Sequence, residues 1–456
     1  ETALRPLVRW SLRFGHSSMS TPMIPPNRKG LPQGPLCDTL QLCSTGRNSV
    51  PRRPDVTESR TGPLTDLRVL DISTVLAGPT TCQVLADYGA DVIKIEHPTR
   101  ADTLRGHGAQ IDGEGLWWKV VARNKRCIGL YLGSPEGAEI FEKLVPTADV
   151  IVENFRPGTL ERWGLGYERL AEINPGIVLC RITGFGQDGP YADRPAFGTL
   201  IEAMSGFAHM TGEADRPPTL PPFGLADSIA GLAGVSAVMM ALHHRDRTGV
   251  GQQIDLSILE PLTSALGPHI ITYDQTGHVQ SRSGNRSNNN APRNTYLTSD
   301  QHWVVVSSSA ESIARRAMEL VGRSDLTDEP WFDTGAGRAE HADEIDEAMS
   351  QWIGELDLET VVAEFAAAEV ALAPVYDVAH YVADPQVVAR GAVVRVDDQS
   401  LGTVAMQNVL FKMSETPGAI RHTGRSLGAD TDALLHGELG ISHEQLNDLR
   451  QGGVIA

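Results

Sequence analysis

Residues 67–96 read LRVLDISTVLAGPTTCQVLADYGADVIKIE, and this stretch decides the fold. Two short runs rich in Val, Ile and Leu, at 67–73 and 90–96, flank a segment that begins near Pro79. Such runs are typical of buried strands, and Pro is favoured in the first turn of a helix. The stretch therefore predicts a strand, a helix and a second, parallel strand, which form a β-α-β unit.

The same alternation continues for about 190 residues. Further strands are predicted at 127–132, 149–155, 176–186 and 252–259, with helices at 134–144 and within 160–173. Strands that alternate with helices predict a largely parallel, doubly wound, Rossmann-like α/β sheet. In such a sheet ligands bind beyond the carboxyl ends of the strands, so the turn residues there form the candidate binding rim.

One match to a nucleotide-binding pattern is misleading. Residues 184–189, GFGQDG, fit G-x-G-x-x-G and follow a predicted strand. A dinucleotide site needs this motif to open a helix in the first β-α-β unit, but Pro190 and a polar segment follow it here. The sequence therefore does not predict a nicotinamide or flavin site.

The segment TLPPFGLADSIAGLAGVSAVMMALHH, residues 219–244, places the carboxylate of Asp227 before a long apolar run. Asp is a preferred N-cap, and a run that is apolar on every side predicts a buried helix from Ser228 to His244. From this local pattern alone, Asp227 is either a structural cap or a nucleophile, since carboxylates form covalent acyl intermediates.

A second, smaller domain is predicted beyond a polar loop at 279–295. HWVVVSSS (302–309) predicts a strand, and amphipathic patterns predict helices near 311–322 and 341–372. We place the large domain at 63–285, the small domain at 290–385 and a C-terminal return to the large domain at 386–456. In that return, 393–414 predicts an antiparallel strand pair, and Ser442 and Gly452 bound a short helix.

Composition narrows the possible partners. The 456-residue chain carries a formal charge of −18, which argues against nucleic acid and anionic membranes as partners. The apolar run at 229–242 is shorter than a bilayer span. The scattered cysteines predict reduced thiols, and the absence of C-x-x-C and H-E-x-x-H motifs predicts no metal site. These cysteines are Cys37, Cys43, Cys82, Cys127 and Cys180.

Residues 1–62 differ from the rest, because nine Lys or Arg and four Asp or Glu stand before residue 61. Their Pro, Ser and Arg content predicts disorder. Arg5, Arg9 and Arg13 recur beside apolar residues, as in an organellar transit peptide. The alternative, which we favour, is a mis-assigned start or added sequence. We expect a cytoplasmic protein, or a mitochondrial one if residues 1–18 are a genuine transit peptide.

With these blocks assembled, the chain from Leu67 to Ile455 resembles the class III CoA-transferases, the CaiB/BaiF family. The resemblance lies in VLDISTVLAGP, ADVIKIE, RNKRCIGLYL, DVIVENFRPGTLERWGLGYE, RITGFGQDGP, FGLADSIAG, RTGVGQQIDLSILE and DPQVVARG. It implies an interlocked homodimer and a two-domain α/β fold. It also implies an enzyme with no tightly bound cofactor, for which coenzyme A or acyl-CoA is the substrate and a carboxylic acid the acceptor.

The resemblance makes Asp227 the nucleophile, which carries CoA as an aspartyl thioester. It implies contacts with CoA from strand-end residues of the large domain, with Arg105 and Arg162 as phosphate partners. These residues are Leu76, Ala77, Arg105, Leu130, Asn154, Phe155, Arg162, Ala196 and Phe197. The overall pattern is closest to members that use dicarboxylates such as succinyl-CoA.

Two alternatives stay open at this point. An α-methylacyl-CoA racemase needs a His in a G-H-D stretch, but this chain has Phe197-Gly198 there. A non-catalytic acyl-CoA binding protein would have no use for a buried carboxylate at Asp227. Two departures from the family pattern concern His97, where relatives carry a basic residue, and the Asn-rich loop 283–290, where formyl-CoA transferase has a glycine-rich one.

Overall fold

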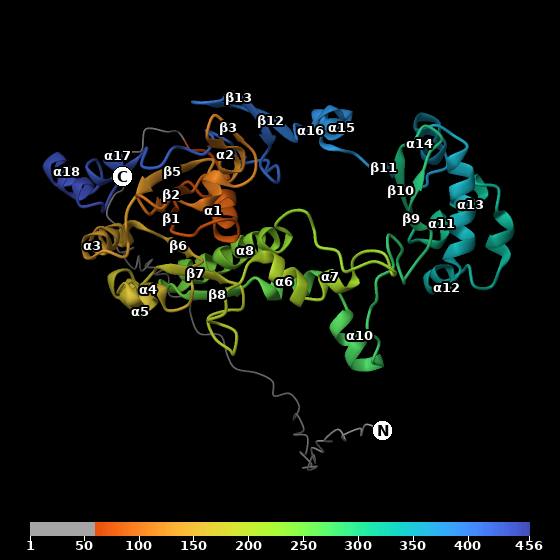
Figure 1. Cartoon of the computed structure of the whole chain (residues 1–456), viewed down its shortest axis with the longest axis horizontal. Helices are drawn as coiled ribbons and strands as arrows, with labels where there is room; N and C mark the ends of the chain where they lie inside the picture. Colours follow the sequence, from red (N-terminus) through yellow and green to blue (C-terminus); the bar gives the residue numbers. More distant parts are fainter. Residues whose placement is uncertain (1–59) are drawn as a thin grey trace, which may run out of the picture. The chain divides into compact units, whose positions relative to one another are not determined.

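Six parallel strands form the central sheet of the large domain, as the sequence predicts (Figure 1). The computed structural model describes residues 60–456, so the predictions for residues 1–59 lie outside the described residues. The strands are β1 (Arg68–Asp71), β2 (Asp91–Glu96), β5 (Lys125–Gly129), β6 (Val150–Glu153), β7 (Val178–Thr183) and β8 (Gln253–Ser257). Their order is β5-β2-β1-β6-β7-β8, so the direction of winding reverses between β1 and β6. That reversal opens a crevice at the carboxyl ends of these two strands.

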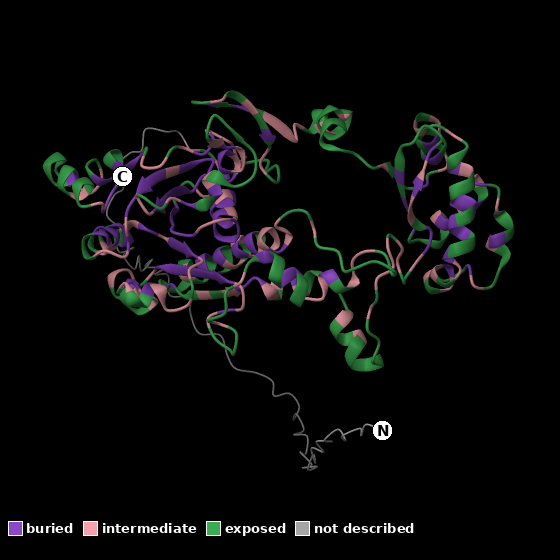
Figure 2. Cartoon of the chain, viewed as in Figure 1, coloured by how far each residue is buried: buried purple, intermediate pink, exposed green. Residues whose placement is uncertain are grey.

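Helices cover both faces of this sheet, and alternate strand residues supply two separate cores (Figure 2). Leu70 and Ile151 belong to one core, whereas Val69 and Val150 belong to the other. This alternation follows from the two-residue period of a strand. The first face is covered by α3 (Pro135–Leu144), α4 (Thr159–Arg162), α5 (Tyr167–Ile173), α17 (Thr431–Leu435) and α18 (His443–Gln451). The second is covered by α1 (Ala77–Asp87), α6 (Gly198–Met204), α8 (Leu225–Thr248) and α9 (Leu259–Ala265).

Local signals placed several helix ends correctly. Ser134 caps α3 by accepting the Gly137 N–H at 3.0 Å, and Ser442 forms a capping box on α18. No helix follows GFGQDG, which confirms that this motif is not a dinucleotide fingerprint. The sequence missed the hairpin of β3 (Gln110–Ile111) and β4 (Glu114–Gly115) with α2 (Leu116–Val121), and it placed β5 two residues late.

A second core lies between Ala291 and Val370. Its antiparallel sheet has the order β11-β10-β9, from β9 (Arg293–Leu297), β10 (Trp303–Ser307) and β11 (Leu372–Pro374). Its helices are α11 (Glu311–Leu320), α12 (Gly335–Glu340), α13 (Ala342–Gly354) and α14 (Leu358–Ala367). The single helical stretch predicted at 341–372 is therefore wrong, because Asp357 caps a new helix by accepting the Thr360 N–H. We propose the domain boundary near residue 290 on the basis of this separate core.

The remaining elements connect and extend the two cores. They are α7 (Phe207–Met210), α10 (His269–Thr276), α15 (Val378–Ala383), α16 (Pro385–Arg390) and the antiparallel pair β12 (Val393–Asp398) and β13 (Gly402–Gln407). The C-terminal segment then returns to the edge of the large sheet. There the Cys127 N–H donates to Asp430 and the Gly129 N–H donates to Thr431.

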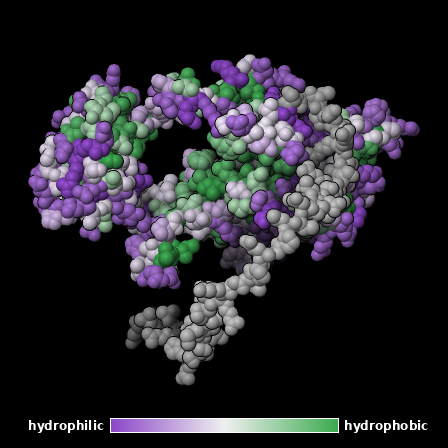
Figure 3. Space-filling model, turned by 180° about the vertical axis from the view of Figure 1, so that it is seen from behind, coloured by the Kyte–Doolittle hydropathy of each residue, from purple (hydrophilic) through white to green (hydrophobic). Residues whose placement is uncertain are grey.

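Helix α8 corrects two predictions. It begins at Leu225 after Gly224, so Asp227 is the third residue of the helix and not its N-cap. The helix is also not buried on every side, because Leu232, Met239 and Met240 are exposed. Among the described residues it is the one helix long and apolar enough to cross a bilayer, although it packs against α1, α6, α9 and the sheet as a core helix does. Figure 3 shows hydrophobic surface gathered around this helix.

Candidate active site

Asp227 opens into a cavity of about 230 Å³ at the crevice between β1 and β6. The loops after β1, β6 and β7 and the first turn of α8 supply its walls, as expected for the carboxyl edge of a doubly wound sheet. We call it the Asp227 cavity. Five of the residues predicted from the sequence line it beside Asp227: Leu76, Asn154, Phe155, Ala196 and Phe197.

Helix α6 approaches the Asp227 carboxylate at a glycine. A Cβ at Gly198 would lie 2.3 Å from Asp227 Oδ2 and 3.1 Å from its Cγ, so no larger residue fits without displacing the carboxylate. The absence of a side chain lets the Gly198 N–H donate a hydrogen bond to Asp227. The glycine therefore sets the position of the carboxylate.

Asp227 is held in an environment that disfavours its ionised form. Burial raises its pKa to about 6, and the neighbouring charge of Glu202 acts in the same direction. The hydrogen bond from Gly198 lowers the pKa but does not offset these two effects. A carboxylate with a raised pKa in a cleft is a candidate for chemistry, because it is more basic and more nucleophilic than a solvated one.

A buried charge network holds the loop after β1. Asp102 accepts the Val75 N–H at 3.1 Å and lies 3.2 Å from the ammonium of Lys94. Lys94 also donates to the Ser73 carbonyl, while Asp71 accepts a hydrogen bond from Lys125 at 2.8 Å. Burial opposes ionisation of Asp71, but Lys125 and Lys94 outweigh it and hold its pKa below the ordinary value.

This network holds Val75 in a left-handed conformation, with φ of +65°. A β-branched residue pays about 1–3 kcal/mol in this region, so the surrounding contacts must impose it. The turn directs the next residue, Leu76, into the Asp227 cavity and against Gly224 at the start of α8. Strain at this point therefore links the end of β1 to the helix that carries Asp227.

Asn154 joins the two strand ends across the crevice. Its Oδ1 accepts the Thr74 N–H at 2.7 Å, and its Nδ2 donates to the Thr74 carbonyl at 2.7 Å. The amide thus forms a two-point clamp on the backbone, which the sequence did not reveal. Asn154 lines the cavity while it fixes the width of the crevice.

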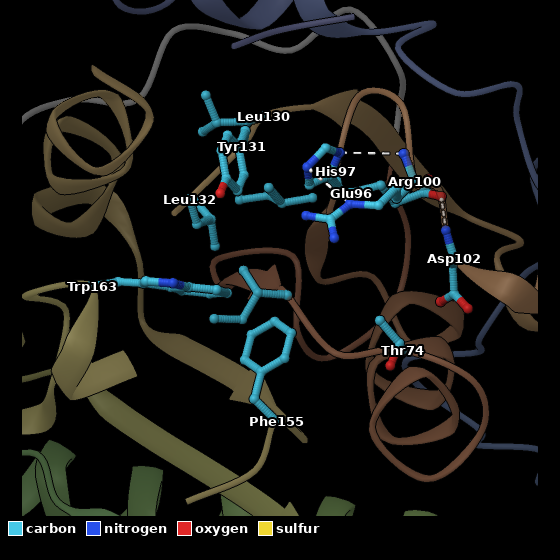
Figure 4. Close-up of a pocket in the computed structure, with 12 residues that line it drawn as sticks. Thr74, Glu96, His97, Arg100, Asp102, Leu130, Tyr131, Leu132, Phe155 and Trp163 are labelled. Carbon is cyan, nitrogen blue, oxygen red and sulfur yellow. Dashed lines mark hydrogen bonds between the residues drawn. The ribbon is translucent and has the colours of Figure 1, made fainter. Parts of the chain in front are cut away.

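A second cavity, of about 290 Å³, adjoins the first at Thr74 and Phe155, and we call it the His97 cavity. Figure 4 shows Leu130, Tyr131 and Leu132 on one side of it, opposite Phe155 and Trp163. His97 accepts the backbone N–H groups of Thr99 and Arg100 through Nδ1 and packs against the ring of Tyr131. Leu130 lines this cavity, and the apolar walls suit a flat or chain-like ligand.

Three predicted residues lie outside both cavities. Arg105 makes a two-point contact with Glu96, at 2.8 and 2.7 Å, and its guanidinium covers Trp118, so its role as a phosphate partner stays a prediction. Arg162 is exposed at the end of α4, and its role as a phosphate partner stays a prediction. Ala77 is buried at the start of α1, directly after Leu76.

Sequence reasoning missed several residues that the fold brings to these cavities. Arg156 and Arg194 line the Asp227 cavity, and Arg100 lines the His97 cavity. Glu202 reaches the first turn of α8 from α6. Arginines in turns and one acid within an apolar helix are common on protein surfaces, so no local signal distinguished these four.

Comparison with known proteins identifies the chain. The model of CoA-transferase family III matches residues 64–431. The chain belongs to CoA-transferase family III. It is 39% identical over 394 residues to succinyl-CoA–D-citramalate CoA-transferase of Chloroflexus aurantiacus, covering 86% of this chain and 98% of that protein. It is 34% identical over 377 residues to succinate–glutarate CoA-transferase of Agrobacterium fabrum, covering 81% and 94%.

A solved structure supports the same assignment. The crystal structure of a CaiB/BaiF family protein from Brucella suis matches with a TM-score of 0.73 and 32% identity, over 83% of this chain and all of that one. The family resemblance and the α/β fold predicted from the sequence are thereby confirmed. This family III member is a CoA-transferase enzyme, and CoA thioesters are its substrates.

The close approach of Gly198 to Asp227 is directly testable. We expect Gly198→Ala to lower turnover by about 100-fold while the protein stays folded, because an added Cβ, 2.3 Å from Oδ2, displaces the carboxylate by about 1 Å. Steady-state CoA transfer and a thermal melt measure the two effects. Gly354→Ala is the control, since its Cβ would lie 3.7 Å from the nearest atom, the Leu297 carbonyl oxygen. Normal turnover in Gly198→Ala would contradict the assignment.

Proposed function

We propose that this enzyme transfers CoA from succinyl-CoA to a second carboxylic acid through covalent intermediates on Asp227. The observation that carries the proposal is a half-buried carboxylate of raised pKa in a cavity at the strand ends. The names of the relatives, which pair succinyl-CoA or succinate with citramalate and glutarate, support the donor. The donor and the acceptor then share one chemical class, the dicarboxylates.

The reaction proceeds in two symmetrical halves. An Asp227 oxygen attacks the thioester carbonyl, the C–S bond breaks, and CoA leaves as a thiolate while a mixed anhydride forms. The thiolate then attacks Cγ of Asp227 and releases the donor acid, which leaves an aspartyl-CoA thioester. The acceptor carboxylate attacks Cγ of this thioester, the C–S bond breaks, and a second mixed anhydride forms. The CoA thiolate then attacks the acceptor carbonyl of the anhydride, which gives the new acyl-CoA and frees the Asp227 carboxylate. Each bond broken is about as energy-rich as the bond formed, so the reaction needs no resident cofactor.

An isomerase of the racemase type is disfavoured at the same site. Two bases must flank the α-carbon in such an enzyme. No histidine is among the residues that line the Asp227 cavity, and Phe197 lies there instead. A phenyl ring cannot carry a proton, so the second base is missing from this part of the described structure.

The nucleophile is tested by mass spectrometry. We expect succinyl-CoA to leave a CoA-sized adduct on the peptide that contains Asp227, and Asp227→Ala to abolish the adduct and lower turnover by more than about 10³-fold. Asp246→Ala is the control, since it removes an exposed carboxylate at the far end of the same helix. Full turnover in Asp227→Ala would refute the mechanism. A wild-type enzyme that forms no CoA adduct but exchanges the α-proton of the substrate would indicate an isomerase.

The cavity also offers a basis for recognising dicarboxylates. The guanidinium groups of Arg156 and Arg194 line it, and neither forms an ion pair with another described residue. Arg194 stacks on the ring of Tyr191 at 3.6 Å, which orients its fork. Guanidinium groups bind carboxylates through charge-assisted hydrogen bonds. We propose that these two arginines bind the free carboxylate at the far end of the succinyl group and of the acceptor.

The role of Arg194 is tested by comparing two donors. We expect Arg194→Gln to lower kcat/KM for succinyl-CoA by about 10- to 100-fold and to leave butyryl-CoA, which lacks the distal carboxylate, unchanged. Arg247→Gln removes an exposed arginine at the far end of α8 and serves as the control. Equal losses with both donors would show that Arg194 binds the CoA portion instead.

We also propose a homodimer, because apolar side chains of α8 are left uncovered in the single chain. Leu232, Met239 and Met240 line a groove with Leu410 and Phe411, and Met240 is 71% exposed. Exposed apolar patches of this kind mark protein interfaces. Identical chains are the commonest partners in soluble oligomers, so a second copy of this chain is the occupant that we propose.

The oligomeric state is measured by sedimentation velocity. We expect the wild-type protein to sediment with twice the mass of the chain, and Met240→Glu to shift it toward the single chain because a buried charge destabilises an interface. Ile111→Glu changes an exposed apolar residue of the β3–β4 hairpin and should leave the dimer intact. A wild-type protein that stays monomeric at micromolar concentration would refute the proposal.

A further inference from the structure

Glu202 lies beside Asp227 but has no part in the mechanism described so far. Its side chain projects from α6, one helical turn after Gly198, and the residue is 1% exposed. Its Oε1 accepts the N–H of Ala226, the residue before Asp227, at 3.1 Å. A single short helix therefore presents two groups to the first turn of α8, a hydrogen-bond donor at Gly198 and a carboxylate at Glu202.

This arrangement changes what the start of α8 does for Asp227. The first N–H groups of a helix lack partners within it and carry partial positive charge, which normally stabilises an acid in the first turn. Here the Ala226 N–H donates to Glu202, so part of the stabilisation by the helix N-terminus acts on Glu202 and not on Asp227. Asp227 receives one N–H, from Gly198, and the repulsion of a second acid.

We propose that Glu202 is a positioning residue whose buried negative charge destabilises the free Asp227 carboxylate and thereby favours acylation of that residue. When Asp227 attacks the thioester, its negative charge leaves with the CoA thiolate as the C–S bond breaks, and its side chain becomes a neutral anhydride. The same is true of the aspartyl-CoA thioester. Repulsion from Glu202 is present before these steps and absent after them, so its relief favours both intermediates.

Within residues 60–456, no other acid packed against α8 is placed to act in this way. The elements packed against α8 are α1, α6, α9, β7 and β8. The ionisable groups that these elements carry, with those of the cavity wall, are Cys82, Asp87, Cys180, Arg181, Arg156, Arg194, Asp255, Glu202 and Glu260. Asp87 is paired with Arg123 and Arg181 with Glu153, while Asp255 and Glu260 are exposed. Apart from Asp227, the charged residues of α8 lie at its opposite end, beyond Leu242.

The inference rests on the proposed role of Asp227, and Glu202→Gln tests it. Glutamine keeps an oxygen that accepts the Ala226 N–H, but it removes the charge. Only ionised Asp227 attacks, so kcat/KM for succinyl-CoA in the wild type should fall below about pH 6, in line with the pKa of Asp227. In Glu202→Gln this acidic limb should move down by about 0.5–1.5 pH units, because removing a nearby negative charge lowers the pKa of an acid.

A second readout must change by the same factor. At pH 8 the ratio of aspartyl-CoA adduct to free enzyme, measured by intact mass at fixed succinyl-CoA and succinate, should fall by about 3- to 30-fold in Glu202→Gln. The repulsion between Glu202 and Asp227 determines both the shift of the acidic limb and the fall in the adduct ratio. If Glu202 had only a structural role, these two changes would not be related. Glu260→Gln is the matched control and should leave both unchanged, because its carboxylate is exposed on α9.

An acidic limb that stays in place in Glu202→Gln, or that moves equally in Glu260→Gln, overturns the inference. Should Glu202→Gln fail to fold, infrared titration of the wild type can still overturn the inference. The carboxyl band that Asp227→Asn removes should titrate near pH 6, and titration near pH 4 would overturn the inference. This measurement uses the free enzyme, so it stands even if no CoA adduct forms. If the wild-type enzyme forms no adduct but Asp227 titrates near pH 6, the proposed function is refuted. The interaction of Glu202 with Asp227 is then tested by the titration alone.

Discussion

Beneath the loop that follows β1, the buried ammonium of Lys94 lies 3.2 Å from Asp102 and 3.8 Å from Asp71. Unpaired charges at this depth would be very costly, so each group requires the others. Asp102 uses this position to hold the Val75 N–H, and the resulting left-handed turn sends Leu76 toward α8. The crevice between β1 and β6 therefore depends on a buried charge cluster that holds one of its walls at Val75.

Electrostatics also determine the state of Asp227, the proposed nucleophile. A carboxylate is a weak nucleophile when water or helix N–H groups stabilise it fully. Asp227 stands in the first turn of a 24-residue helix, yet burial and Glu202 oppose its ionisation and the Ala226 N–H is already occupied. The fold places the acid at a helix N-terminus, which normally stabilises a carboxylate, but burial and Glu202 offset part of that stabilisation. In the mechanism that we propose, destabilising the charged ground state in this way favours the uncharged covalent intermediates.

The local patterns predicted the parallel sheet well because a buried strand and an amphipathic helix each leave a regular trace in the sequence. These patterns failed where contacts between segments, or the choice between two possible caps, decided the position of a residue. Asp227 has the side chain of an N-cap, but Gly224 takes that place and the carboxylate turns to Gly198. Glu355 to Asp357 interrupt a continuous apolar pattern because Asp357 caps a new helix. Met240 has the hydropathy of a core residue and yet is exposed.

The sequence by itself determined the family and the alternation of strands and helices, and it made Asp227 the candidate nucleophile, because these depend on residue type and order along the chain. Only the tertiary structure decided which charges meet. It paired Arg105 with Glu96, and it brought Arg156, Arg194 and Glu202 around Asp227. Electrostatic interactions act between atoms a few ångströms apart, and that separation is set by packing between segments distant in sequence.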